Sequence, residues 1–221
     1  RRSSDLLLNF LENVHTENIR IDFLTNEVSP ELETFLQKYH SRIFAIPNLK
    51  HPVGQYREVC RILEAESYDI VYLNISTAID CIAAWAAKKK KVPRIFIHSH
   101  TSGNDCENPV KRMIFDSIHK FCRLSLYRAA TEYYGCSEKA GLWMFPEKIV
   151  KSDRFQMIFN AVDLKKFTYS SAVRDDVRKE LNLENKFVVG HVGNFVYQKN
   201  HYFLIDIFEE LKRKCPEAVL L

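Results

Sequence analysis

Short apolar segments typical of β-strands alternate with amphipathic helix patterns along the whole chain. The strand patterns lie at residues 19–25, 42–46, 69–73, 94–97, 132–135, 155–159, 187–189 and 218–221. The helix patterns lie around them, at residues 5–14, 30–39, 56–66, 76–88, 110–128, 138–145, 174–181 and 203–211. Alternation of this kind predicts an α/β fold in which mainly parallel sheets are covered by helices.

Length and composition are those of a folded chain. The 221 residues suffice for one large or two ordinary domains, and 46% of them are apolar, which favours a packed core over disorder. The first helix pattern has no strand pattern before it, and a second α/β unit has only begun when the sequence stops. We therefore expect the chain to be part of a longer protein.

Positive charge is concentrated in one region of the sequence. Residues 88–151 contain 13 Lys and Arg against 6 Asp and Glu, although the whole chain carries a formal charge of only +4. Such a region favours phosphate, an anionic membrane surface or an acidic polymer as partner, and a solvated helix face is the alternative. We do not expect nucleic-acid binding, because aromatic residues do not alternate with the basic ones and no nucleic-acid motif occurs. The residues that we expect to contact an acceptor or a membrane are Lys88, Lys89, Lys90, Lys91, Lys111 and Arg112.

The six cysteines form no C-x-x-C pair and have no zinc-ligand spacing with histidine. Scattered thiols of this kind favour a reducing compartment and no structural metal. No run of 18 apolar residues occurs, so we expect no transmembrane helix.

The stretch from Lys186 to Leu211 predicts a strand, a glycine-containing turn and an amphipathic helix. Gly190 and Gly193 lie in the turn, which ends in Lys199 and Asn200. Glycine lets a backbone approach a ligand, and a helix start offers free N–H groups to phosphate. The local pattern leaves two interpretations open: Lys199 binds phosphate, or Gly193 merely turns the chain and Lys199 is a solvated residue at the helix start.

Two histidines, His98 and His100, follow the predicted strand at residues 94–97. Ligands of open α/β sheets bind at the carboxyl ends of the strands, where imidazole can donate hydrogen bonds or transfer protons. The alternative is one core histidine and one incidental histidine, and a metal site would need a third ligand that the sequence does not offer. Ser137 is interpreted as a helix N-cap rather than a nucleophile.

Three stretches, taken together, resemble the family 4 glycosyltransferases of the GT-B type, especially the bacterial capsular and exopolysaccharide branch. They are PRIFIHSHTS (93–102), YRAATEYYGCSEKAGLWMF (127–145), and MIFNAVDLKKF continuing to GHVGNFVYQKNHYFLIDIF (157–208). The resemblance implies two Rossmann-like domains, an acceptor-side domain at residues 1–163 and the start of a nucleotide-sugar domain at 164–221. It also implies a retaining transfer, without a metal or other cofactor, from a nucleotide-sugar such as a UDP-sugar to a glycan or lipid-linked acceptor in polysaccharide biosynthesis. Such a protein is expected to be cytoplasmic and peripheral at the inner membrane face.

The resemblance also assigns site residues. His100 matches the active-site histidine, with His98 as second choice, while Lys199 and Gly193 match the donor-phosphate loop. Asn194 stands where the family has arginine. The family's first strand and glycine-rich loop, and its downstream E-x7-E motif, are expected outside this sequence, so we expect the chain alone to be inactive. The alternatives are a UDP-sugar epimerase of the GT-B type and a non-catalytic, glycosyltransferase-like binding subunit.

Overall fold

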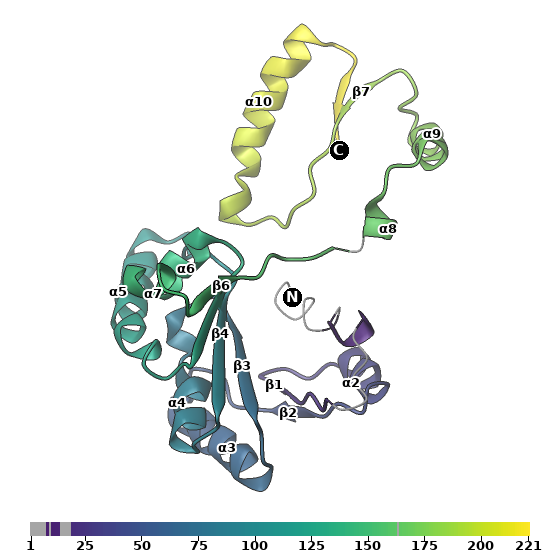
Figure 1. The fold of residues 1–221 in the computed structure, drawn as a ribbon. Coiled ribbons are helices and arrows are strands. Elements are labelled where there is room, and N and C mark those ends of the chain that lie inside the picture. Colours follow the sequence, from purple (N-terminus) through teal and green to yellow (C-terminus); the bar gives the residue numbers. More distant parts are fainter. Residues whose placement is uncertain (1–7, 9, 14–18, 163) are drawn as a thin grey trace. The chain divides into compact units, whose positions relative to one another are not determined.

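The computed structural model describes residues 8, 10–13, 19–162 and 164–221, which form two units (Figure 1). The first unit holds the described part of Arg1–Asn104 together with Met113–Ala161. The second holds Asp105–Arg112 and the described part of Val162–Leu221. The assignment of domains to residues 1–163 and 164–221 stays a prediction.

The first unit is built on parallel strands. Four of them form a sheet in the order β3-β4-β5-β6, and β1 and β2 form a separate parallel pair. The elements are β1 (Phe23–Thr25), α2 (Pro30–Gln37), β2 (Ile43–Ala45), α3 (Pro52–Ala65), β3 (Ile70–Ile75), the short 3₁₀ helix η1 (Ala78–Asp80), α4 (Ile82–Lys89), β4 (Arg94–Ser99), α5 (Pro109–Leu126), β5 (Glu132–Gly135), α6 (Glu138–Met144), α7 (Glu147–Val150) and β6 (Phe155–Met157).

From residue 164 on, the described residues of the second unit form one parallel strand pair, three α-helices and one 3₁₀ helix. In chain order the elements are α8 (Leu164–Phe167), α9 (Ser171–Glu180), β7 (Phe187–Val189), the 3₁₀ helix η2 (Tyr197–Lys199), α10 (His201–Lys214) and β8 (Ala218–Leu220). β7 pairs with β8 in parallel, as a strand–helix–strand unit requires. The α/β class with parallel sheets, predicted from the alternating pattern, is confirmed.

Several predicted boundaries differ from the structure. The helix expected from residue 56 already begins at Pro52, since a proline at the first helical position gives up no needed N–H. The helix expected over residues 76–88 is interrupted, with η1 before α4. Strand β4 continues through Ser99 and so includes His98. The helix predicted at residues 5–14 falls partly outside the described residues.

The two faces of the four-stranded sheet differ in character. One face contributes to the buried apolar core together with residues of α4, α6 and α7, and its strand residues are Leu73, Ile95, Ile97 and Tyr133. Because side chains alternate along a strand, the even-numbered residues point to the opposite face. There Tyr72, Phe96, His98 and Tyr134 form a layer of rings in edge-to-face contact. The sheet therefore places His98 within an aromatic layer.

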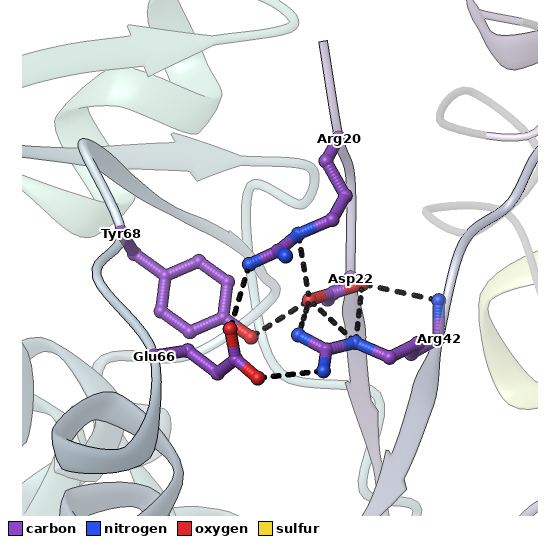
Figure 2. Close-up of polar contacts among 5 residues, drawn as sticks. All are labelled: Arg20, Asp22, Arg42, Glu66 and Tyr68. Atoms are coloured by element: carbon purple, nitrogen blue, oxygen red, sulfur yellow. Dashed lines mark hydrogen bonds and ion pairs between the residues drawn. The ribbon is translucent and has the colours of Figure 1, made fainter.

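A network of charged side chains joins the segments that enter β1, β2 and β3 (Figure 2). Its centre is Asp22, whose side chain is 0% exposed and accepts hydrogen bonds from the Arg42 guanidinium (2.7 Å) and the Tyr68 hydroxyl (2.8 Å). Glu66 pairs with both Arg20 (3.0 Å) and Arg42 (2.7 Å). Burial raises the pKa of Asp22, but the hydrogen bonds from Arg42 and Tyr68 outweigh burial and hold that pKa below its usual 3.8. The network thus links the two sheets of the first unit at the amino ends of their strands.

Replacing Asp22 with asparagine is expected to lower the free energy of unfolding by about 2 kcal/mol at neutral pH. The loss is smaller than for a deeply buried ion pair because Arg42 is 41% exposed. Since the folded state lowers the pKa of Asp22, its contribution is present above pH 3.8 and disappears at lower pH, so the difference between the two proteins should shrink there. Urea unfolding at neutral and acidic pH measures the difference in free energy of unfolding between the two proteins. Glu58→Gln, which breaks a pair with the 66% exposed Arg61, is the control, and equal losses in both variants would contradict the prediction.

Candidate active site and donor loop

His98 lies in β4 and is completely buried. Its Nδ1 shares a hydrogen bond with the hydroxyl of Tyr72 on the neighbouring strand β3. Burial and the adjacent His100 lower the pKa of His98 to about 4, and burial raises the pKa of Tyr72 to about 12, so both groups are neutral near pH 7. Whichever group donates, the hydrogen bond occupies Nδ1 and leaves Nε2 for another partner.

His100 follows β4 at the carboxyl edge of the sheet, and its ring centroid lies 4.1 Å from that of His98. Its backbone N–H donates to the carbonyl of Ile75 at the end of β3 (3.3 Å). Burial lowers the pKa of His100, and the side chain of Asn160, in the turn after β6, opposes the shift. Among the described residues, neither His98 nor His100 has a normal hydrogen-bond partner for its buried Nε2.

Buried polar atoms are normally hydrogen-bonded, so two unmatched imidazole nitrogens at one edge need an explanation. Hydroxyl or carbonyl oxygens of a ligand are groups that could satisfy these two nitrogens. Neutral, buried imidazoles form hydrogen bonds to such a ligand without bringing charge to it. The edge where parallel strands end is also where open α/β sheets bind ligands. The structure therefore brings together the two histidines predicted from the sequence.

The second predicted site is the loop between β7 and α10. A Cβ built on Gly193 would lie 3.3 Å from Cγ and 3.4 Å from Cδ of Lys199, so the lysine stem passes directly over the glycine. The same Cβ would lie 3.0 Å from Nε2 of His191. Gly193 thus leaves room for two side chains that a Cβ at this position would crowd. Glycine permits this close approach.

Two asparagines in this loop have different roles. The carbonyl of Asn194 accepts a hydrogen bond from the N–H of Val196 (2.8 Å), and its side chain is exposed. Asn200 adopts a left-handed conformation with φ 42°, and its side chain caps α10 by accepting from the N–H of Phe203 (3.4 Å). Asparagine tolerates this conformation better than most residues. The position after Lys199 therefore has a structural role in starting α10.

Sequence reasoning missed the groups that support both sites. Tyr72 was not recognised as the partner of His98, because a cross-strand pair depends on register. In the donor loop, the sequence-based prediction did not include His191 and His201. Their ring centroids lie 5.0 Å apart, so the two histidines flank the loop together. His191 lies within GHVGN, two residues before Gly193, and this position is the sequence signal that could have indicated His191 as a loop residue.

The predicted basic contacts lie on two segments, the run from Lys88 to Lys91 at the end of α4 and the first turn of α5. Lys88 donates to the carbonyl of Arg128 (2.5 Å) and lies 5.5 Å from the Trp85 ring, and Lys90 pairs with Glu64, which raises the pKa of Lys90. The run from Lys88 to Lys91 precedes the amino end of β4, whereas His98 and His100 are at its carboxyl end. The run is therefore not part of the histidine site.

Lys111 and Arg112 lie in the first turn of α5. Arg112 donates to the carbonyl of Cys106 (2.7 Å), and its guanidinium lies 4.9 Å from the Tyr197 ring centroid. In the part of the chain that the structure describes, no three His, Cys, Asp or Glu side chains gather as metal ligands. No described helix is both long enough and apolar enough to cross a membrane.

Comparison with curated protein sequences gives a glycosyltransferase-like relative. No family model matches the sequence. EpsF of Bacillus subtilis (strain 168), a candidate glycosyltransferase, is 23% identical over 218 residues, which cover 95% of this chain and 55% of EpsF. A relative that is 23% identical supports a glycosyltransferase-like protein, but it does not define the family of this chain.

Solved structures show the same fold. HepE (Alr3699) of Anabaena in complex with UDP-glucose has a TM-score of 0.64 at 16% identity, covering 91% of this chain and 59% of HepE. A candidate UDP-N-acetylglucosamine 2-epimerase from Listeria monocytogenes has a TM-score of 0.55 at 13% identity, covering 99% of this chain and 58% of that protein. These likenesses show the fold alone, and they confirm the GT-B type of α/β architecture. The chain spans less than two thirds of the length of each of these relatives.

Proposed function

We propose that the protein containing this chain is a glycosyltransferase that moves a sugar from a UDP-sugar to a glycan or lipid-linked acceptor. The observation that carries the proposal is the pair of buried histidines with unmatched Nε2 atoms at the carboxyl edge of the first sheet. The fold shared with HepE, which was solved with UDP-glucose, supports the choice of donor. The finer assignment to family 4, with retention of configuration and no metal, is part of the same proposal.

In this proposal the two sites have separate tasks. The bond between the anomeric carbon and the phosphate oxygen breaks, the acceptor oxygen bonds to that carbon, and UDP departs with the electron pair and the acceptor's proton. Lys199 and the first N–H groups of α10 stabilise the charge that develops on the departing phosphate. His100 and His98 hold hydroxyl groups of the transferred sugar or acceptor. Asn194 adds hydrogen bonds but no charge, so Lys199 carries more of the electrostatic task.

The proposal includes an acceptor presented at an anionic membrane surface on the cytoplasmic side. Lys88, Lys89, Lys90, Lys91, Lys111 and Arg112 are its proposed contacts. Each basic residue near such a surface contributes about 1 kcal/mol. Lys89 and Lys91 are exposed and suit this role better than Lys88 and Lys90, whose side chains have partners within the unit.

Two observations favour alternatives. The fold is shared with a candidate 2-epimerase, which makes epimerisation of a UDP-sugar the second candidate function. Asn194 in place of a charged residue favours a third, a non-catalytic binding subunit.

Incubating the full-length protein with UDP-sugars and acceptor extracts separates the three candidates. Transfer is expected to release UDP and to yield a glycosylated acceptor. A changed sugar that remains on UDP would instead establish an epimerase. Calorimetric binding of UDP with neither product would establish a binding subunit.

A further inference from the structure

Helix α5 lies at the outside of the first unit (Figure 1), and several of its large apolar side chains are exposed. Five of its exposed apolar residues recur at helical spacing along one side, which places them on a single face. They are Met113, Ile114, Ile118, Phe121 and Leu124, with exposed fractions of 63%, 50%, 42%, 77% and 64%. We call these five residues the α5 outer face. Contiguous apolar surface of this kind marks an interaction site on a folded protein.

The orientation of α5 is held by contacts on its opposite side. His119 is buried and stacks on Trp143 with ring centroids 3.8 Å apart, while its Nδ1 accepts from the N–H of Ala78 (3.1 Å). Its Nε2 donates to the carbonyl of Trp143 (2.9 Å). Leu126 is also completely buried. Turning the outer face inward would break these contacts, so the apolar face stays outside.

The one polar residue within the outer face is compatible with an apolar environment. The hydroxyl of Ser117 donates to the carbonyl of Met113 one turn earlier (2.8 Å) and so does not need water as a partner. Hydroxyls that bond back to the helix in this way can enter a low-polarity medium at little cost.

The charges of α5 indicate which partner covers the face. The helix contains four basic residues, of which Arg112 and Arg123 donate to backbone carbonyls and Lys111 and Lys120 are exposed. Its one acidic residue, Asp116, accepts from the side chain of Asn104 (3.2 Å). Lys120 is exposed at the edge of the face. A helix with an apolar face and basic borders is complementary to anionic headgroups over an acyl layer. A second copy of the same face would bring like charges together, which is unfavourable.

We propose that the α5 outer face lies in the interface of an anionic membrane, with its apolar side chains between the lipids and its lysines at the headgroups. This proposal deepens the membrane part of the proposed function and does not depend on the sugar chemistry. The sequence-based prediction placed the membrane contact on the lysine run at 88–91, whereas here the main contact is the apolar α5 outer face.

Sedimentation with vesicles tests the proposal. The full chain is expected to bind vesicles of phosphatidylcholine with phosphatidylglycerol, and to bind pure phosphatidylcholine weakly. The double variant Phe121→Asp, Leu124→Asp is expected to lose about tenfold or more in affinity, because it puts charge into the acyl layer. Val53→Asp on α3, whose parent residue is 61% exposed, is the matched control and should bind as wild type. Circular dichroism then verifies that the variants are folded, as expected for exposed positions.

The outcomes separate this inference from the proposed function. If the double variant binds as wild type while Lys88–Lys91→Gln does not bind, the lysine run is the contact and the α5 proposal is wrong. Failure of the wild type to bind any vesicle overturns both membrane proposals and leaves sugar transfer untouched. Self-association of the wild type that the double variant abolishes, without vesicle binding, would make the face an interface between copies and would also overturn the proposal.

Discussion

Replacing Lys199 with alanine is expected to lower kcat/KM for sugar transfer by about 100-fold or more. The side chain passes over Gly193 at the start of α10, where the helix N-terminus adds a positive field. In the proposed reaction two negative charges gather on the departing UDP, and Asn194 supplies no cation to offset them. The loss should therefore appear mainly in kcat, since the charge is largest in the transition state.

The comparison variant for this experiment is Lys214→Ala. Lys214 is exposed at the opposite end of α10, so this variant removes the same charge far from the donor loop. Steady-state kinetics with the full-length protein measure both variants, and calorimetry with UDP reports binding separately. Lys199→Arg should retain part of the activity, because it keeps the charge. Equal activity of Lys199→Ala and Lys214→Ala would remove Lys199 from the site.

The second large effect is expected for His100→Ala, which should lower kcat/KM by about 100-fold. The substitution removes an imidazole whose buried Nε2 has no hydrogen bond of normal geometry among the described residues, although the side chain of Asn160 acts on its pKa. His98 keeps its hydrogen bond to Tyr72, so the fold around the site should remain. Exposed His51, at the start of α3, provides the control His51→Ala, which should leave the rate unchanged.

The pH dependence of the reaction distinguishes two roles for the histidines. Burial holds the pKa of His98 at about 4 and lowers that of His100 from the usual 6.5, so both imidazoles are neutral at pH 7. If they act as neutral hydrogen-bonding groups, kcat/KM should not fall through a transition near pH 6.5 as the pH is lowered. A wild-type profile with a transition near 6.5 that His100→Ala abolishes would instead show that His100 exchanges protons in the reaction.

Most of the element order was predictable because it depends on local periodicity. The strand at residues 132–135 and the cap at Ser137 were both predicted, and the cap's hydroxyl accepts from the N–H of Ala140 (3.2 Å). Boundaries were less predictable where local rules compete, as at residues 76–81, where a 3₁₀ turn replaces the first part of an expected helix. Short-range preferences do not decide between these forms.

The sequence by itself determined the fold class and the chemical types at the site. The strand–helix alternation specifies parallel sheets, and the position of His98 and His100 after a strand pattern places them at the carboxyl edge. Only the tertiary structure decided that the Tyr72 hydroxyl occupies Nδ1 of His98, that Lys199 passes over Gly193, and that the apolar face of α5 points outward. The first and the third depend on register and packing between residues distant in sequence, and the second depends on the path of the loop between Gly193 and Lys199, none of which a periodic pattern encodes.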